Sequence, residues 1–120
     1  MSKNIYFNKE HEQVRKAVRD FVNKRINPFV DEWEEQGIAP LHELFKEMGN
    51  LGFLGIRYDP KYGGEGLDYW YETIVLEECA RIQCGGIPMA IAVQTHMATP
   101  ALYEFGSEYL KEKYLRPAIK

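Results

Sequence analysis

The sequence lacks several features that would direct it to particular classes of protein. Its 120 residues contain only two cysteines and no surplus of basic residues, with 15 Lys and Arg against 18 Asp and Glu. No apolar run approaches the ~20 residues that a membrane span needs, and no apolar leader follows the first residues. The charge balance argues against nucleic-acid binding, which usually takes a basic surplus. We therefore expect a cytoplasmic protein with no membrane span and no nucleic-acid partner.

The two cysteines and three histidines do not predict a metal or redox site. Cys79 and Cys84 are five residues apart, which separates them in angle on a helix, and a zinc or redox pair needs closer spacing. No histidine has a carboxylate at a helical ligand spacing, so we expect no metal. His96 could line a pocket, although a surface or hydrogen-bonded histidine is the more common outcome. Both cysteines are expected to be free thiols in a reducing compartment.

The composition indicates a single all-helical domain over residues 1–120. There are 14 Glu against 4 Asp, with only 3 Thr and 2 Ser. Glu favours helices, whereas the other three favour caps, turns or strands. A hydrophobic content of 45% with 28% charged residues is that of a globular chain. No segment shows a strand alternation, and the chain is too short for two independent cores.

Apolar periodicity predicts about five to six helices in an up-and-down orthogonal bundle. Caps and breakers set their expected limits: Asn8 and Ser107 as N-caps, Pro28 and Pro100 as kinks, and Pro117 as a stop. The expected helical ranges are 8–36, 40–49, 68–82, 88–105 and 107–116. Between residues 49 and 66, six of the ten glycines alternate with apolar residues, which predicts a packed loop.

Two segments are candidates for chemistry. Residues 63–66, Gly-Gly-Glu-Gly, lack the following Lys-Ser/Thr of a nucleotide loop, so a tight turn with positive φ is the favoured interpretation. Residues 89–93 are apolar on all sides, which predicts either a central core helix or one wall of an apolar pocket. The residues alone favour the core.

Four motifs, in order and at matching spacing, resemble the N-terminal helical domain of the acyl-CoA dehydrogenases. The resemblance runs from about Glu10 to Lys120. The motifs are Ile26-Asn27-Pro28 with Trp33, Met48-Gly49 through Gly55, Tyr62-Gly63-Gly64-Glu65-Gly66 with Glu77-Glu78, and Phe105-Gly106-Ser107-Glu108 with Lys111 and Tyr114-Leu115.

The resemblance implies an FAD-dependent enzyme that removes an α-proton and a β-hydride from an acyl-CoA thioester. The family has a helical domain, a middle β-domain and a C-terminal helical domain. We expect only the first part here, with the catalytic Glu and most flavin contacts in the other two. No residue of this chain is therefore expected to be catalytic, and the chain alone is expected to be inactive. The resemblance also implies that the full-length enzyme is a homo-oligomer.

The resemblance further implies two sites on this domain. The fourth helix would form a wall of the acyl pocket, and its small residues favour a medium or long chain. The residues of this wall are Met89, Ala90, Val93, Gln94 and Met97. An electron-transferring flavoprotein would dock on Val14, Phe53 and Val75, beside Glu65, which is charged where the family is usually apolar.

Two other functions stay open on the sequence. An acyl-CoA oxidase or a flavin monooxygenase of the same superfamily would share this domain and differ outside it. An autonomous helical binding module would bury its apolar residues. A domain that works against other domains would instead leave the segment 89–97 and the fifth helix partly exposed.

Overall fold

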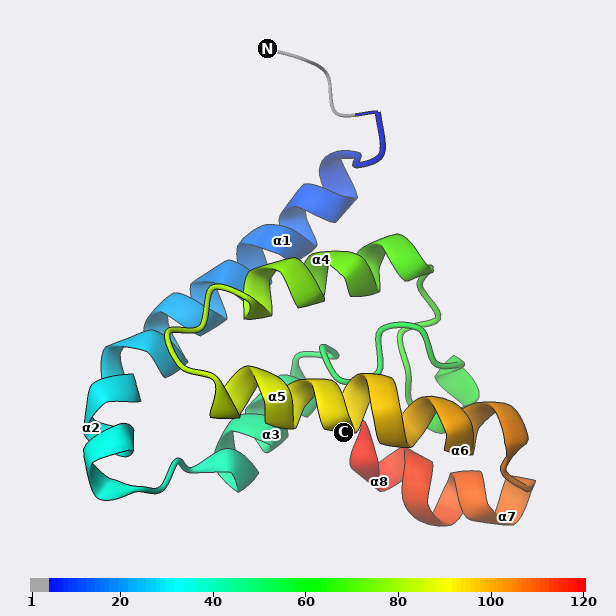
Figure 1. Ribbon diagram of the computed structural model, residues 1–120. Coiled ribbons are helices and arrows are strands. Elements are labelled where there is room, and N and C mark those ends of the chain that lie inside the picture. Colours follow the sequence, from blue (N-terminus) through cyan, green and yellow to red (C-terminus); the bar gives the residue numbers. More distant parts are fainter. Residues whose placement is uncertain (1–4) are drawn as a thin grey trace.

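The computed structural model describes residues 5–120. The regular secondary structure of these residues is entirely helical, with no strand, and loops connect the helices (Figure 1). Two helices are regular, α3 (Leu41–Asn50) and α4 (Tyr69–Cys79). The others form three continuous rods of mixed helical type. These are α1 (Lys9–Phe21), η1 (Val22–Ile26), η2 (Asn27–Phe29) and α2 (Val30–Gln36); then α5 (Gly86–Ala92), η4 (Val93–Ala98) and α6 (Thr99–Phe105); then α7 (Glu108–Leu110), η5 (Lys111–Leu115) and α8 (Arg116–Ala118).

The expected bundle of about five helices is therefore confirmed for the described residues. A short 3₁₀ turn, η3 (Pro60–Tyr62), lies in the glycine-rich loop. In Figure 1, α4 and the rod of α5, η4 and α6 run in opposite directions. Within residues 5–120, no helix combines the length and the apolar content that crossing a membrane takes.

Three prolines explain why each rod changes its helical type. A proline cannot donate a hydrogen bond to the carbonyl four residues earlier, and its ring crowds that carbonyl. The residue four positions before Pro28 lies in η1, the one before Pro100 lies in η4, and the one before Pro117 lies in η5. Each of these three segments is a wide π turn. The chain thus absorbs each proline by widening the preceding turn, as π-bulges do.

The expected caps are confirmed, while several helix limits differ. Asn8 accepts a hydrogen bond from the amide of His11 in a capping box, and Ser107 caps α7. The third helix ends at Cys79, three residues before the expected Ile82, and the fourth begins at Gly86. Pro117 was expected to end the last helix but lies inside it, because the π turn before it accommodates the ring.

The central helix is α4, and the expectation of a central fourth helix is wrong. The main core gathers residues of α1, η1, α3 and α4 together with Ile87 and Ile91 of α5. Helix α4 is buried on more than one side, and its buried residues include Glu72 and Glu78. The hydropathy pattern does not reveal that α4 is central, because two of its buried residues, Glu72 and Glu78, are charged. Cations from other segments surround these carboxylates in the folded domain.

Glu78 joins α1 to α4 through a cluster of arginines. Its side chain is only 1% exposed. Arg19 donates to both of its oxygens at 2.9 and 2.8 Å, Arg15 donates at 3.1 Å, and Arg81 lies 3.1 Å away. These cations, with the hydrogen bonds from Arg19 as the largest contribution, lower the pKa of Glu78 below its ordinary value. The pair of helices is thereby fixed by a charge cluster as well as by apolar packing.

The glycine-rich loop is packed closely against its own chain. A Cβ at Gly64 would overlap the carbonyl oxygen of Tyr58, and one at Gly63, where φ is +95°, would overlap the side chain of Lys120. Amides of Glu65, Gly66 and Leu67 donate to the carbonyls of residues 55, 58 and 56. The expected tight turn with positive φ is confirmed at Gly63 and Gly66.

Glu78→Gln should destabilise the fold by about 1 to 3 kcal/mol, because the buried carboxylate that Arg15 and Arg19 share, at 15% and 42% exposure, is replaced by a neutral amide. The pKa of Glu78 is lowered by folding, so its contribution is full above the ordinary glutamate pKa and declines as the pH falls towards the folded value. Urea unfolding measured from pH 7 to pH 3 should therefore show that the difference in free energy of unfolding between wild type and variant becomes smaller in acid. Glu47→Gln, at an exposed pair with Arg25, should lower the stability far less. An equal loss of stability in Glu78→Gln and Glu47→Gln would contradict the role of the arginine cluster.

Gly64→Ala should destabilise the domain by at least about 2 kcal/mol, because the added methyl overlaps the backbone of Tyr58. Gly85→Ala is the matched control, since Gly85 has an ordinary φ and open space around its Cβ position. Thermal unfolding of the two variants should show a large fall in Tm for the first and little change for the second. A similar small effect in both would contradict the close packing of this loop.

Candidate functional site

Three of the five expected pocket residues form an exposed apolar stripe. Met89, Val93 and Met97 lie on α5 and η4 and are 58%, 44% and 61% exposed. The opposite side of the same rod is buried through Ile87, Ile91 and two threonines. The rod therefore buries one face in the domain and leaves the other as an unpartnered apolar surface.

The other two residues, Ala90 and Gln94, lie to one side of this stripe. Together with Val93 they line a groove of about 410 Å³ between α3, α5, η4 and α8. The amide of Gln94 donates to the carbonyl of Ala118 at 2.8 Å, which ties η4 to the last helix. Three exposed side chains, His42, Lys46 and Lys120, give this groove a basic edge. The five residues thus fall on two adjoining surfaces of one rod, with Val93 on both.

The last rod is also exposed along its aromatic residues. Tyr109, Leu110 and Tyr114 are exposed, and so is Phe105 just before it. Leu115 and Ile119 hold the rod to the domain in a second small core with Tyr58 and Tyr62. The exposure expected of a domain that works against other domains is therefore confirmed at both the segment 89–97 and the fifth helix.

The three residues expected to dock an electron-transfer partner lie mostly inside the domain. Phe53 and Val75 belong to the main core and line one small internal cavity, whereas Val14 is half-buried and packs against the same core. Glu65 is exposed and lies over Gly52. Phe53 and Val75 are therefore buried, whereas Val14 is partly exposed and Glu65 is exposed.

A polar network beside the stripe was missed by the sequence reasoning. Glu72 of α4 is buried, pairs with Arg57 of the loop, and lies 3.1 Å through Oε1 from Nε2 of His96. On the other side of the ring, Nδ1 of His96 lies 2.5 Å from the hydroxyl of Thr95. Arg57 also stacks on the ring of Tyr69. The sequence signal was faint, because these residues are 15 to 39 positions apart and follow no motif.

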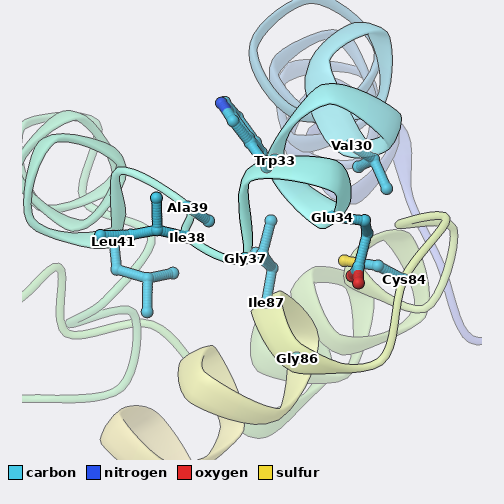
Figure 2. A pocket seen from close by; sticks show the side chains of 10 residues that line it. All are labelled: Val30, Trp33, Glu34, Gly37, Ile38, Ala39, Leu41, Cys84, Gly86 and Ile87. Carbon is cyan, nitrogen blue, oxygen red and sulfur yellow. The ribbon is translucent and has the colours of Figure 1, made fainter.

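The pocket in Figure 2 lies between α2, residues 37–41 and the start of α5. Its volume is about 260 Å³, and its lining is mainly apolar, including Trp33, Ile38 and Ile87, with Glu34 and Cys84 as the polar groups. None of the five expected pocket residues lines it. Both cysteines are free, as expected, with Cys79 buried and Cys84 partly exposed.

The described residues do not hold a group of three or more metal-ligating side chains. The glycine loop does not form a phosphate cradle either, because Tyr58 and Lys120 fill the space in front of Gly63 and Gly64.

Exposed apolar surfaces such as the stripe and the last rod mark sites where a ligand or another protein surface binds. The model for the N-terminal domain of acyl-CoA dehydrogenases matches residues 8–120. The chain is 41% identical over 113 residues to glutaryl-CoA dehydrogenase of Desulfococcus multivorans, which covers 89% of this chain and 28% of that protein. The chain belongs to the acyl-CoA dehydrogenase family and corresponds to its N-terminal domain.

Two further relatives agree with this family assignment. The caffeyl-CoA reductase–Etf complex subunit CarC of Acetobacterium woodii is 34% identical over 116 residues, covering 96% of this chain and 30% of that protein. The structure of a glutaryl-CoA dehydrogenase of Mycobacterium smegmatis in complex with FADH2 superposes with a TM-score of 0.87 at 28% identity, covering 98% of this chain and 30% of that one. The chain thus spans less than a third of the length of these relatives.

Cys84 should react with a thiol reagent in the native chain while Cys79 stays protected. Burial raises the pKa of Cys79 to about 12, so it holds almost no thiolate at neutral pH, whereas Cys84 at the pocket is partly exposed. A colorimetric thiol titration at pH 8 should find about one fast thiol per chain and two after denaturation. Cys84→Ser should remove the fast thiol. A fast reaction that survives this substitution would contradict the burial of Cys79.

Proposed function

We propose that this chain works as the N-terminal domain of an FAD-dependent acyl-CoA dehydrogenase, spanning residues 1–120. The observation that supports this is the exposed stripe of Met89, Val93 and Met97 on a domain of that family. Apolar side chains left in water cost free energy unless a ligand or another domain covers them. An acyl chain and the rest of a longer enzyme would supply that cover.

The proposed reaction is α,β-dehydrogenation of an acyl-CoA thioester. A proton leaves the α-carbon, a hydride leaves the β-carbon, and a double bond forms between them. FAD, when bound, accepts the hydride. This domain would bind and orient the acyl chain and exclude water from it, and the base would come from outside this chain.

The flavin does not fit a site made of these residues alone. The glycine loop cannot hold its phosphates, because the loop is filled by its own chain and carries Glu65, and the cations Lys46 and Lys120 line the groove that Ala90, Val93 and Gln94 of the proposed wall also line. We therefore assign no residue of this domain to FAD. In our proposal, the flavin is held mainly by a middle β-domain and a C-terminal helical domain, in a homo-oligomeric enzyme. The relative from M. smegmatis is a flavin complex.

The wall would consist of Met89, Ala90, Val93, Gln94 and Met97. Small side chains at positions 90 and 93 leave room beside the rod, which favours a medium or long acyl chain. A tunnel of this kind selects length by volume, because each methylene contributes about 1 kcal/mol of transfer free energy.

The electron acceptor we propose is an electron-transferring flavoprotein. The relative from A. woodii is a subunit of a complex with such a protein. Docking would use the surface at Val14 and Glu65, with Phe53 and Val75 supporting it from beneath. An acyl-CoA oxidase would use the same wall with a different acceptor, whereas an autonomous binding module is disfavoured by the exposed stripe.

Val93→Trp in the full-length enzyme should shift the preference towards shorter acyl chains. An indole at the centre of the stripe would take the volume of several methylenes, so the ratio of kcat/KM for eight-carbon over four-carbon acyl-CoA should fall tenfold or more, by about 10 to 100. Lys16→Trp, on the exposed side of α1, is the control and should leave the ratio unchanged. An unchanged ratio in Val93→Trp would show that this rod is not the wall.

A further inference from the structure

The segment η4 is a wide turn in the middle of the proposed wall. Pro100 lacks the N–H that would bond to the carbonyl of His96, and residues 93–98 take π geometry instead. Widening a turn leaves backbone carbonyls that need donors. The hydroxyl of Thr99 donates to the carbonyl of Gln94 at 2.7 Å, and the hydroxyl of Thr95 donates to that of Ile91 at 2.9 Å. These hydroxyls add side-chain donors to carbonyls around the wide turn, and the carbonyl of Gln94 also accepts from the amide of Thr99.

Groups from two other segments hold this turn from the buried side. The hydroxyl of Tyr58 in the loop lies 2.7 Å from that of Thr99, and burial raises the pKa of Tyr58, so it remains a neutral donor. Glu72 of α4 meets His96 at 3.1 Å and is itself paired with Arg57. The turn is therefore in polar contact with the loop through Tyr58 and with α4 through Glu72, whose 3.1 Å approach to His96 is a close contact without hydrogen-bond geometry.

The wide turn changes which residues share a face of the rod. In a regular α-helix, four residues turn about 400°, so each step of four drifts by about 40°. From Met89 to Val93 the rod is α-helical and this drift occurs. From Val93 to Met97 the rod is π-helical, and because a π turn takes more residues, the drift runs the other way. The two drifts offset each other, which keeps all three exposed side chains in one straight stripe.

We propose that His96 is a positioning residue for acyl-chain selection, acting through the π turn that it anchors to Glu72. This inference rests on the proposed function, because it takes the stripe as the wall of the acyl pocket. His96 does not touch the acyl chain through its nitrogens, since one faces Glu72 and the other faces Thr95. Its effect is to fix the direction in which Val93 and Met97 point.

The test compares four variants of the full-length protein. His96→Phe removes the contact with Glu72, and His96→Gln keeps an amide donor at that position. Pro100→Ala restores the missing N–H, so that a regular α turn can form without loss of any ion pair. Arg19→Gln is the control, because it removes one arm of the Glu78 cluster at a distance from the wall. Two measurements are made on each: kcat/KM for four-carbon and eight-carbon acyl-CoA, and amide hydrogen exchange of residues 93–99.

We expect His96→Phe and Pro100→Ala to change the ratio of the two kcat/KM values by about tenfold, since one methylene in an apolar pocket is worth about that factor. Exchange at 93–99 should rise in His96→Phe. His96→Gln should stay near wild type, and Arg19→Gln should lose stability with the ratio within about twofold. If His96→Phe does not fold, Pro100→Ala decides the outcome alone.

An unchanged ratio in an active Pro100→Ala enzyme, or the same change in Arg19→Gln, overturns this inference and leaves the proposed function standing. Unchanged exchange in His96→Phe also overturns it, because His96 would then not hold the turn. A wild-type enzyme with bound flavin that turns over neither acyl-CoA contradicts the proposed function itself.

Discussion

The position of α4 between its two neighbours is the constraint on which the rest of this domain depends. Glu78 holds α4 to α1 through Arg15 and Arg19, with Arg81 just after α4 as a third partner, and Glu72 connects α4 to the loop and to η4. The two carboxylates are six residues apart, so they point to different sides of the helix. A buried carboxylate is tolerated only where cations and donors surround it. Packing around α4 must therefore satisfy charge and shape together, which fixes the neighbouring helices closely.

The apolar surface of the domain follows from this arrangement. With α4 at the centre, the rod of α5, η4 and α6 lies at the edge and buries only one face. Its other face, the stripe of Met89, Val93 and Met97, remains open. The glycine loop supports this geometry, because its close contacts with Tyr58 and Lys120 hold the last helix near η4. The stripe is thus the face of the rod that the packing around α4 leaves uncovered.

Much of this could be read from the sequence, and the failures share one cause. Asn8, Gly37, Asp68 and Ser107 were identifiable as helix caps, because capping depends on residues within three or four positions. The role of α4 was not identifiable, since an isolated Glu72 or Glu78 reads as a surface residue until its partners are known. For residues 89–93 the residues alone favoured the core, and the exposure of the stripe was predicted only through the family resemblance.

The sequence by itself determined the all-helical class, the caps, the places where proline interrupts a helix and the family. These are local matters of propensity and of motifs kept in order along the chain. Only the tertiary structure decided which helix is central, how Pro100 is absorbed as a wide turn, and which groups satisfy that turn. Those outcomes depend on contacts between residues far apart in sequence, such as Glu72 with His96 and Arg19 with Glu78. The free energy of burying a charge is set by such partners, which no local pattern specifies.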